Sequence, residues 1–234
     1  MDDQTAPLAA IDWDRARSDL DETGAAEIGP VLAPENCAAL AAVFDDERHF
    51  RARIDMARHG FGRGVYKYFA EPLPEPVAAL RQALYPPLAR IAADWAARLG
   101  DAPPPPSLEA LTRACRAAGQ DRPTPLLLRY GPGDYNCLHR DLYGAVAFPL
   151  QAVVMLSRPE DFAGGAFAVV ENRPRLQSRV TVRQPARGHA VVFATARKPR
   201  RTARGWSAST LRHGVSEVTA GQRTTLGIIF HDAA

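Results

Sequence analysis

Apolar residues recur at helical spacing through the first half of the chain, in segments rich in Ala, Leu, Arg and Glu. Side chains three and four residues apart share one face of a helix, so this spacing predicts amphipathic helices. The predicted helices span residues 12–21, 34–45, 76–98 and 107–119.

Prolines modify this pattern. Pro34 stands at a helix start, where its fixed φ is tolerated, whereas Pro86 and Pro87 fall inside the third segment and are expected to kink or split it. Four consecutive prolines within DAPPPPSLEA, residues 101–110, predict a stiff connector.

The pattern changes from Pro123 onward. Short β-rich runs such as LQAVVMLS, AFAVVE, GHAVVFA and RTTLGIIF alternate with turns that contain glycine. Closely spaced short strands favour a sandwich or small barrel. The sequence therefore predicts a mainly β fold with some α: a helical region over residues 1–122 and an all-β core over residues 123–234.

Composition adds little to this picture, but charge adds a candidate surface. No run approaches the roughly 20 apolar residues needed to cross a bilayer. The acidic start MDDQTAPLAAIDWD does not resemble a signal peptide, so a cytoplasmic location is expected. Three scattered cysteines fit a reducing compartment. Arginines and one lysine accumulate from Arg173 to Arg212, and no acidic residue interrupts them. This asymmetry of charge is an argument about binding partners and not about the fold.

A histidine and a carboxylate lie two residues apart at the end of a predicted strand. Side chains at positions i and i+2 of a strand point the same way, so His139 and Asp141 are expected to project into one cavity. His213 is the leading third ligand, with His189 and His231 as rivals. Two histidines and one carboxylate leave three open positions on octahedral iron, which a bidentate co-substrate and dioxygen can occupy.

Arg223 follows His213 by ten residues, on the next predicted strand. A guanidinium there can pair bidentately with the distal carboxylate of 2-oxoglutarate. Thr225 faces the same side, and Tyr130 ends the strand before the metal motif; each hydroxyl is a candidate for a further hydrogen bond to the co-substrate. Cys137 shares the strand face of His139 by alternation, but a free cysteine is more often a small buried hydrophobe than a ligand.

Two further groups are candidate substrate contacts. Asn136 and Tyr143 flank the metal motif and are expected to line the substrate pocket. The segment RKPRRTARGW, residues 197–206, combines cations with an aromatic ring and is predicted to be a loop at the mouth of the active site. Such a loop can bind phosphates and stack a base, although a solvated surface loop explains the composition equally well. Its candidate nucleic-acid contacts are Arg200, Arg201, Arg204 and Trp206.

The blocks RYGPGDYNCLHRD, GGAFAVVE, GHAVVF and RHGVSEVTAGQRTTLGIIF occur in the order of a 2-oxoglutarate oxygenase double-stranded β-helix, over roughly residues 123–231. The first block resembles prolyl-hydroxylase-like members. DMARHGFGRGVYKYF, RPTPLLLRY, NCLHRDLYG and GIIFHD resemble, more narrowly, prokaryotic oxygenases associated with oxidation of damaged DNA. One departure is His189, at a turn where related sequences often carry an acidic residue.

This resemblance implies a jelly-roll core with N-terminal helices packed against it. It also implies Fe(II), 2-oxoglutarate and dioxygen as cofactor and co-substrates, and single-stranded or damaged DNA as the partner. The expected activity is oxidative dealkylation in DNA repair. A peptidyl or small-molecule hydroxylase is the main alternative, and a non-enzymatic DNA-binding module on the same fold is a third. The sequence points to no protein partner.

Overall fold

The computed structural model describes residues 8–173 and 175–234, so the acidic residues Asp2 and Asp3 of the chain start lie outside the described part. Within it the α-helices are α1 (Trp13–Thr23), α2 (Pro34–Val43), α3 (Glu75–Leu99) and α4 (Leu108–Ala117). Short 3-10 turns occur at η1 (Leu8–Ala10), η2 (Glu47–His49), η3 (Met56–His59) and η4 (Pro159–Asp161). Each predicted helix is confirmed within two residues at both ends. No helix of the described residues is long and apolar enough to span a membrane.

Local chemistry explains where these helices begin and end. The side chains of Asp12 and Ser107 accept hydrogen bonds from backbone amides in the first turns of α1 and α4. Gly24 and Gly100 end α1 and α3 in the left-handed conformation that glycine adopts without steric cost.

Of the two expected effects of the prolines, a kink or a split, the split does not occur. Pro86 and Pro87 lie inside α3, which runs unbroken for 25 residues. A proline removes a backbone donor and crowds the preceding turn. Burial compensates here, because α3 packs a continuous apolar face against the sheets, and tertiary packing supplies most of a helix's stability. That face includes Val77, Leu80, Leu84, Leu88, Ile91 and Trp95.

The first half of the chain also contains strands that the helical interpretation missed. They are β1 (Ala25–Ile28), β2 (Phe50–Asp55), β3 (Gly62–Arg63) and β4 (Val65–Phe69). All are short, and all join sheets formed by later residues, so residues before the expected boundary at 122 are built into the same β-structure.

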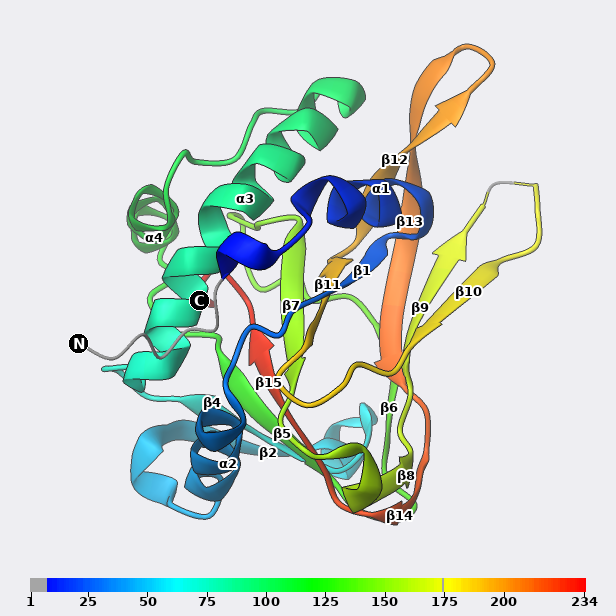
Figure 1. Cartoon of the computed structure of the whole chain (residues 1–234). Helices are drawn as coiled ribbons and strands as arrows, with labels where there is room; N and C mark the ends of the chain where they lie inside the picture. The colour runs from blue at the N-terminus through cyan, green and yellow to red at the C-terminus, as the bar shows by residue number, and fades with distance from the viewer. Residues whose placement is uncertain (1–7, 174) are drawn as a thin grey trace.

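Two antiparallel sheets form the centre of the molecule (Figure 1). The larger has the order β1-β11-β7-β15-β5-β4-β2, with β5 (Leu126–Tyr130), β7 (Leu150–Met155), β11 (Ala190–Ala194) and β15 (Arg223–Ile228). The smaller has the order β10-β9-β13-β6-β3, with β6 (Tyr135–His139), β9 (Phe167–Asn172), β10 (Arg179–Arg183) and β13 (Gly205–Val215). A separate pair joins β8 (Phe162–Gly164) to β14 (Val218–Gly221). The predicted jelly-roll core with packed helices is confirmed.

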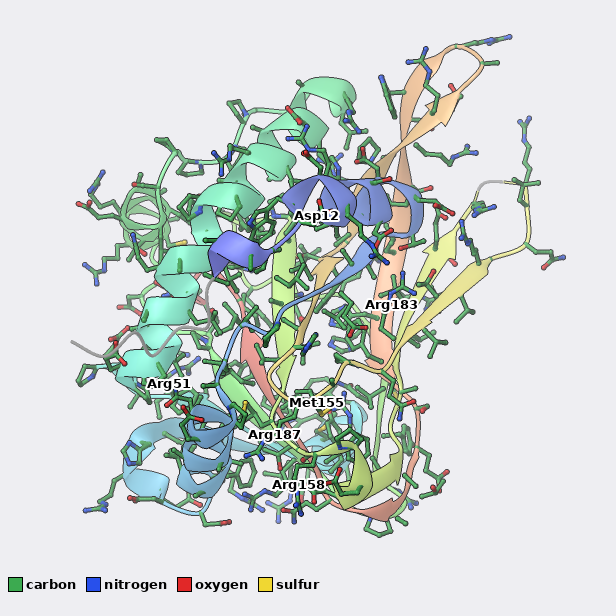
Figure 2. All side chains as sticks on the ribbon, in the orientation of Figure 1. Asp12, Arg51, Met155, Arg158, Arg183 and Arg187 are labelled. Carbon is green, nitrogen blue, oxygen red and sulfur yellow. The ribbon has the colours of Figure 1, made fainter. Side chains whose placement is uncertain are left out.

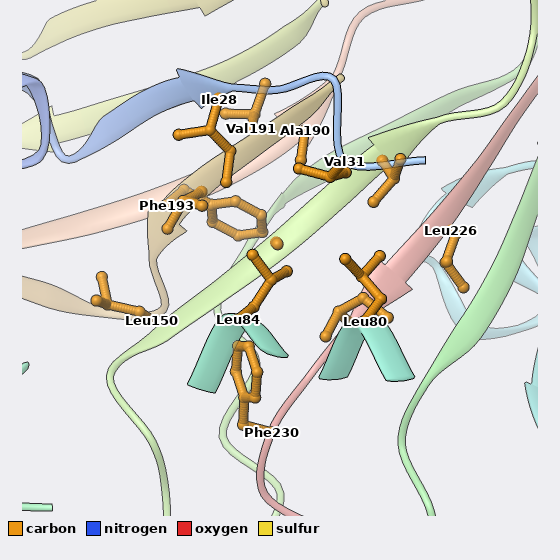
Figure 3. Close-up of a cluster of buried hydrophobic side chains, with 14 of the residues drawn as sticks. Ile28, Val31, Leu80, Leu84, Leu150, Ala190, Val191, Phe193, Leu226 and Phe230 are labelled. Atoms are coloured by element: carbon orange, nitrogen blue, oxygen red, sulfur yellow. The ribbon is translucent and has the colours of Figure 1, made fainter. Parts of the chain in front are cut away.

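The core lies between α3 and the larger sheet. Figure 3 shows Leu80 and Leu84 of α3 beside Leu150 and Phe230, all of them buried. Burial of such side chains contributes roughly 1.5–3 kcal/mol each to folding, which holds the larger sheet as a rigid wall for the site on its other face.

The basic segment at 197–206 is not a loop. β12 (Arg197–Thr202) pairs with the start of β13 in a hairpin that projects beyond the sheets at the end remote from β8 and β14 (Figure 1). Arg197 pairs with Thr210 and Thr202 with Gly205 across its ladder.

Candidate active site

The two histidines of the predicted metal motif lie side by side on neighbouring strands. His139 ends β6 and is the register partner of His213 on β13. The Nε2 atom of His139 lies 3.4 Å from one carboxylate oxygen of Asp141, and the Nε2 atom of His213 lies 3.2 Å from the other. One ligand atom from each residue falls within 4.8 Å of the others, so this cluster could hold a metal ion.

Neighbouring groups fix the orientation of this cluster. The Nδ1 atom of His139 lies 2.7 Å from the carbonyl oxygen of Cys137, which favours a proton on Nδ1 and leaves the lone pair of Nε2 for a metal. The Tyr143 hydroxyl donates to one oxygen of Asp141 at 2.6 Å, and the Gln151 amide donates to the other at 2.8 Å.

The electrostatics of the cluster keep the carboxylate ionised. Burial alone would raise the pKa of Asp141, but hydrogen bonds and charge from His139 and His213 bring that pKa well below its usual range. Burial lowers the pKa of His213 and so favours the neutral imidazole that a metal requires. Burial also opposes a proton on His139, but Asp141 outweighs it and raises the pKa of that histidine.

The rival ligands lie elsewhere. His189 is partly exposed, and its Nδ1 atom lies 3.8 Å from Glu27. His231 is buried and accepts a hydrogen bond from the amide of Phe148. Cys137 is exposed, which contradicts the expectation of a buried thiol, and it is absent from the cluster that could hold a metal.

Arg223 begins β15 in the larger sheet, where it pairs in register with Tyr130 of β5. Its side chain is fully buried, and among the described residues it forms no ion pair. The guanidinium lies over the Tyr130 ring at 5.6 Å, and Nη1 contacts the Thr225 hydroxyl at 3.5 Å, while Nε has no partner. Burial lowers the pKa of Arg223 to about 10, so the side chain is still a cation at neutral pH.

A cavity of about 390 Å³ connects these groups between the two sheets. Its walls include all the predicted metal and co-substrate residues, and also Asn136 and Tyr143. The Asn136 amide reaches the Tyr130 hydroxyl at 3.5 Å. Tyr143 is directed at Asp141, so its observed role is to support the carboxylate.

Some residues of this site escaped the sequence analysis. Gln151, within the apolar run LQAVVMLS, is buried against Asp141; a polar side chain in a buried strand was the available signal. Phe61, Tyr66 and Tyr68 also line the cavity. The alternating tyrosines of VYKYF were a strand signal inside a half interpreted as helical.

The prediction that residues 197–206 border the mouth is wrong. None of them lines the cavity, and Trp206 precedes His213 by seven strand residues, or roughly 23 Å at about 3.3 Å per residue. Two guanidiniums already lie over the Trp206 ring, that of Arg98 at 4.8 Å and that of Arg201 at 5.2 Å from its centroid.

The wider basic run does not form one surface either. Figure 2 shows Arg183 and Arg187 at separate places on the molecule. Arg183 reaches the carbonyl oxygen of Ala25 in β1, and Arg187 donates to that of Pro34 at the start of α2.

The side chains fit the cofactors that this geometry suggests. Imidazole and carboxylate donors suit Fe(II), and each of the three has a hydrogen-bonding or packing partner that orients it. Arg223 is a buried cation without a carboxylate partner, which matches an anionic co-substrate.

Solved structures of other proteins share this fold. A prolyl-4-hydroxylase from Pseudomonas putida superposes with a TM-score of 0.56 at 14% identity, covering 95% of this chain and all of the other. An oxidoreductase of the 2OG-Fe(II) oxygenase family from Burkholderia pseudomallei gives 0.55 at 18% identity, covering 95% and 92%. The chain therefore has the fold of Fe(II)- and 2-oxoglutarate-dependent oxygenases and carries on it a His-Asp-His cluster that could hold the metal ion.

The sequence then places the chain more narrowly. It belongs to a family described as oxygenases catalysing oxidative methylation of damaged DNA, whose profile matches residues 64–233. Two uncharacterized proteins of Mycobacterium tuberculosis, from strains CDC 1551 and H37Rv, are each 52% identical over 174 residues, which is 74% of this chain and 75% of theirs.

Proposed function

We propose that this protein oxidises alkyl groups on damaged DNA bases and thereby removes them. His139, Asp141 and His213 would hold Fe(II), and Arg223 with Thr225 would hold the distal carboxylate of 2-oxoglutarate. The observation that carries the proposal is that a metal-competent cluster and a buried, unpaired guanidinium line the same cavity.

Iron and 2-oxoglutarate supply, when bound, the activation of dioxygen needed to oxidise a C–H bond. The protein supplies position and environment. Arg223 fixes one end of the co-substrate, while Gln151 and Tyr143 hold Asp141 in its ligand orientation. Apolar walls, including Phe167 and Phe193, exclude water from the reacting groups.

Oxidation of a carbon bonded to a base nitrogen releases that carbon as an aldehyde and restores the base. The family description supports damaged DNA as the substrate. A cavity of about 390 Å³ lies within the roughly 300–1,000 Å³ range of small-molecule sites, which suits a single base and not a duplex. The substrate base would therefore enter unpaired, from a single strand or flipped out of a helix.

The test is succinate release with Fe(II), 2-oxoglutarate and oxygen, with and without single-stranded DNA bearing an N-methylated base. We expect the methylated strand to stimulate turnover and formaldehyde to appear in step. The unmethylated strand of the same sequence is the control, and Asp141→Ala should abolish both products.

Succinate formation that methylated DNA leaves unchanged would overturn the DNA proposal and direct the search to peptides and metabolites. Coupled turnover by a protein lacking both His139 and Asp141 would overturn the metal assignment. No turnover with metal verified in the site would favour a non-enzymatic module.

A further inference from the structure

We propose that a surface beside the cavity mouth, and not the basic hairpin, binds the DNA strand that carries the substrate base. This mouth patch consists of Arg58, Phe61, Arg63, Leu138 and Arg140. The inference rests on the proposed function and adds to it where the strand lies and which ring stacks on it.

The mouth patch exposes large apolar groups at the entrance of a buried site. Phe61 is 47% exposed and Leu138 41% exposed, yet both also line the cavity. Single exposed apolar residues are ordinary, but a pair that continues a functional cavity to the surface is typical of a binding site.

The turn that carries Phe61 is held firmly. Met56 anchors it as a fully buried side chain, and the Phe61 amide donates to the Met56 carbonyl at 3.1 Å. The Phe61 carbonyl accepts from the Cys137 amide at 2.9 Å, which ties the turn to the strand of His139. The His59 ring stacks on Phe61 with 5.4 Å between centroids and 22° between planes.

A fixed exposed aromatic ring is a stacking platform. Every base has a π face, so such a ring can bind a single strand without reading its sequence. Because its position is already set, little side-chain entropy is lost on binding.

Exposed cations flank Phe61 in the chain and line the cavity beside it. Arg63 is exposed next to Phe61 and pairs in register with Tyr135 of β6. Arg140 is exposed at the cavity wall. Neither forms an ion pair or a side-chain hydrogen bond among the described residues, so both guanidiniums are available to phosphates.

Arg58 is the third cation, with its side chain 81% exposed. Its Nε atom lies 3.7 Å from Asp55, a long contact that leaves its terminal nitrogens free to approach a phosphate. Asp134, the other acidic side chain near β6, accepts a hydrogen bond from the Gly131 amide and faces its own turn. The patch is therefore net positive.

The hairpin offers a weaker surface for this role. Lys198 is buried against Glu171, and Arg197 pairs with Asp101. The guanidiniums of Arg98 and Arg201 lie over the Trp206 ring, and no residue from 197 to 206 lines the cavity. A strand bound there could not also place its base beside the metal cluster without spanning most of β13.

Two charge-matched variants distinguish DNA binding at the mouth patch from DNA binding at the hairpin. Arg58→Gln/Arg63→Gln removes two cations from the mouth patch, and Arg201→Gln/Arg204→Gln removes two from the hairpin. Binding is measured by fluorescence anisotropy of a labelled single-stranded oligonucleotide with one N-methylated base, on protein loaded with Mn(II) so that the probe is not consumed. Titrations are repeated from low to high salt.

We expect the mouth variant to bind about tenfold or more weakly near 0.1 M salt, with the slope of log K against log salt reduced by about 1.4, since each lost phosphate contact on a single strand accounts for about 0.7. The hairpin variant should match the unmodified protein in both affinity and salt dependence. The reverse pattern would overturn the inference and assign binding to the hairpin.

Phe61 is tested by a second pair. Phe61→Leu keeps an apolar side chain but loses the ring and should weaken binding on the order of fivefold or more. Phe61→Trp should retain affinity, and its indole emission should be quenched by the oligonucleotide. Equal affinity of Phe61→Leu and the unmodified protein would overturn the stacking role.

The outcomes also separate this inference from the function on which it rests. If the unmodified protein neither binds the oligonucleotide nor responds to it in succinate release, the DNA function itself fails. If it does both while the mouth variants behave normally, the function stands and only the mouth patch is wrong.

Discussion

Asp141 is the most heavily engaged side chain of the site. It is almost fully buried, yet both of its oxygens accept hydrogen bonds, from Tyr143 and Gln151, and both face a histidine. A buried carboxylate without such partners would tend to protonate. His139 and His213 therefore keep Asp141 ionised, while Tyr143 and Gln151 hold it in the orientation of a ligand.

Replacing Gln151 by Leu should weaken metal binding. The change keeps similar volume but removes a donor at 2.8 Å from Asp141, and outer partners of metal ligands typically contribute about 10- to 100-fold in affinity. Titration with Mn(II) would measure it. Gln177→Leu, on an exposed surface segment, is the control and should bind normally. Equal affinities would show that Gln151 does not orient the ligand.

Arg223 leads to a prediction about stability. Burial of a cation without a counter-ion opposes folding, so Arg223→Met should leave the ligand-free protein as stable as the unmodified protein or more so. The unmodified protein with Mn(II) should gain about 2.7 kcal/mol at 2-oxoglutarate concentrations 100-fold above its Kd, or roughly 5–10 °C in Tm.

Arg223→Met should lose the stabilisation that 2-oxoglutarate gives the unmodified protein. Arg223→Lys keeps a charge but not the fork and should recover only part of it. Thermal unfolding with and without 2-oxoglutarate distinguishes these cases. A full co-substrate shift in Arg223→Met would remove Arg223 from the 2-oxoglutarate site.

At this scale the sequence predicted the residues with a distinctive chemistry and spacing. His139 and Asp141 share a short motif, and Arg223 follows His213 at a distance that one turn and one strand explain. Gln151 could not be found in the same way, because nothing in an apolar strand says which ligand its amide will face. Phe61 was missed because exposure depends on how a turn is folded.

Among the elements, β3 shows that a strand of only two residues can determine the shape of a site. This two-residue strand joins the turn of Phe61 to β6, and the backbones approach closely at Gly62. A Cβ atom at Gly62 would lie 2.3 Å from the carbonyl oxygen of Tyr135, and its φ of +125° is one that other residues rarely adopt.

Gly62→Ala should therefore force β3 away from β6 and weaken both the fold and oligonucleotide binding. Gly60→Ala is the matched control: its φ of +68° is strained, but its Cβ would meet nothing within 4 Å. We expect about 1–2 kcal/mol of destabilisation for Gly60→Ala and more for Gly62→Ala. Urea unfolding measures both, and equal losses would show that the close approach is unimportant.

Elements differed in how well sequence predicted them. The helices had long periodic segments with recognisable ends, and all four were found. β1 to β4 are short and lie between helices, so their period of two was hidden. The hairpin of β12 and β13 was predicted as a loop because its clustered charges were a stronger signal than the alternation of its side chains. Pairing between residues far apart in the sequence cannot be inferred from a local pattern.

Across the whole molecule, a buried ion pair joins the first half of the chain to its C-terminal segment. Arg81 of α3 contacts Asp232 at 2.8 Å and also donates to the carbonyl oxygen of Phe230. Both side chains are nearly fully buried. The pair fixes α3 over the segment that follows β15.

Asp232→Ala should destabilise the protein by about 3–5 kcal/mol, because it leaves the Arg81 guanidinium buried and unpaired. The double change Arg81→Met/Asp232→Leu removes both charges and should recover most of that loss. Chemical denaturation of the three proteins gives the comparison. An Asp232→Ala protein of normal stability would show that water satisfies Arg81 instead.

The order of strands in the larger sheet determines when this protein can fold during its synthesis. Both edges, β1 and β2, come from the first 55 residues, whereas the central strand β15 is the last to be made. Ala25 pairs with Phe193, and Leu226 lies between Leu127 and Val154. The ribosome therefore releases the edges before the centre exists: β1 must remain unpaired until β11 is made, and the hairpin of β2 and β4 must wait for β5. Such distant pairing slows folding and exposes nascent strands to aggregation, so the larger sheet is expected to close only after β15 has been made, with β1 exposed to aggregation until β11 pairs with it.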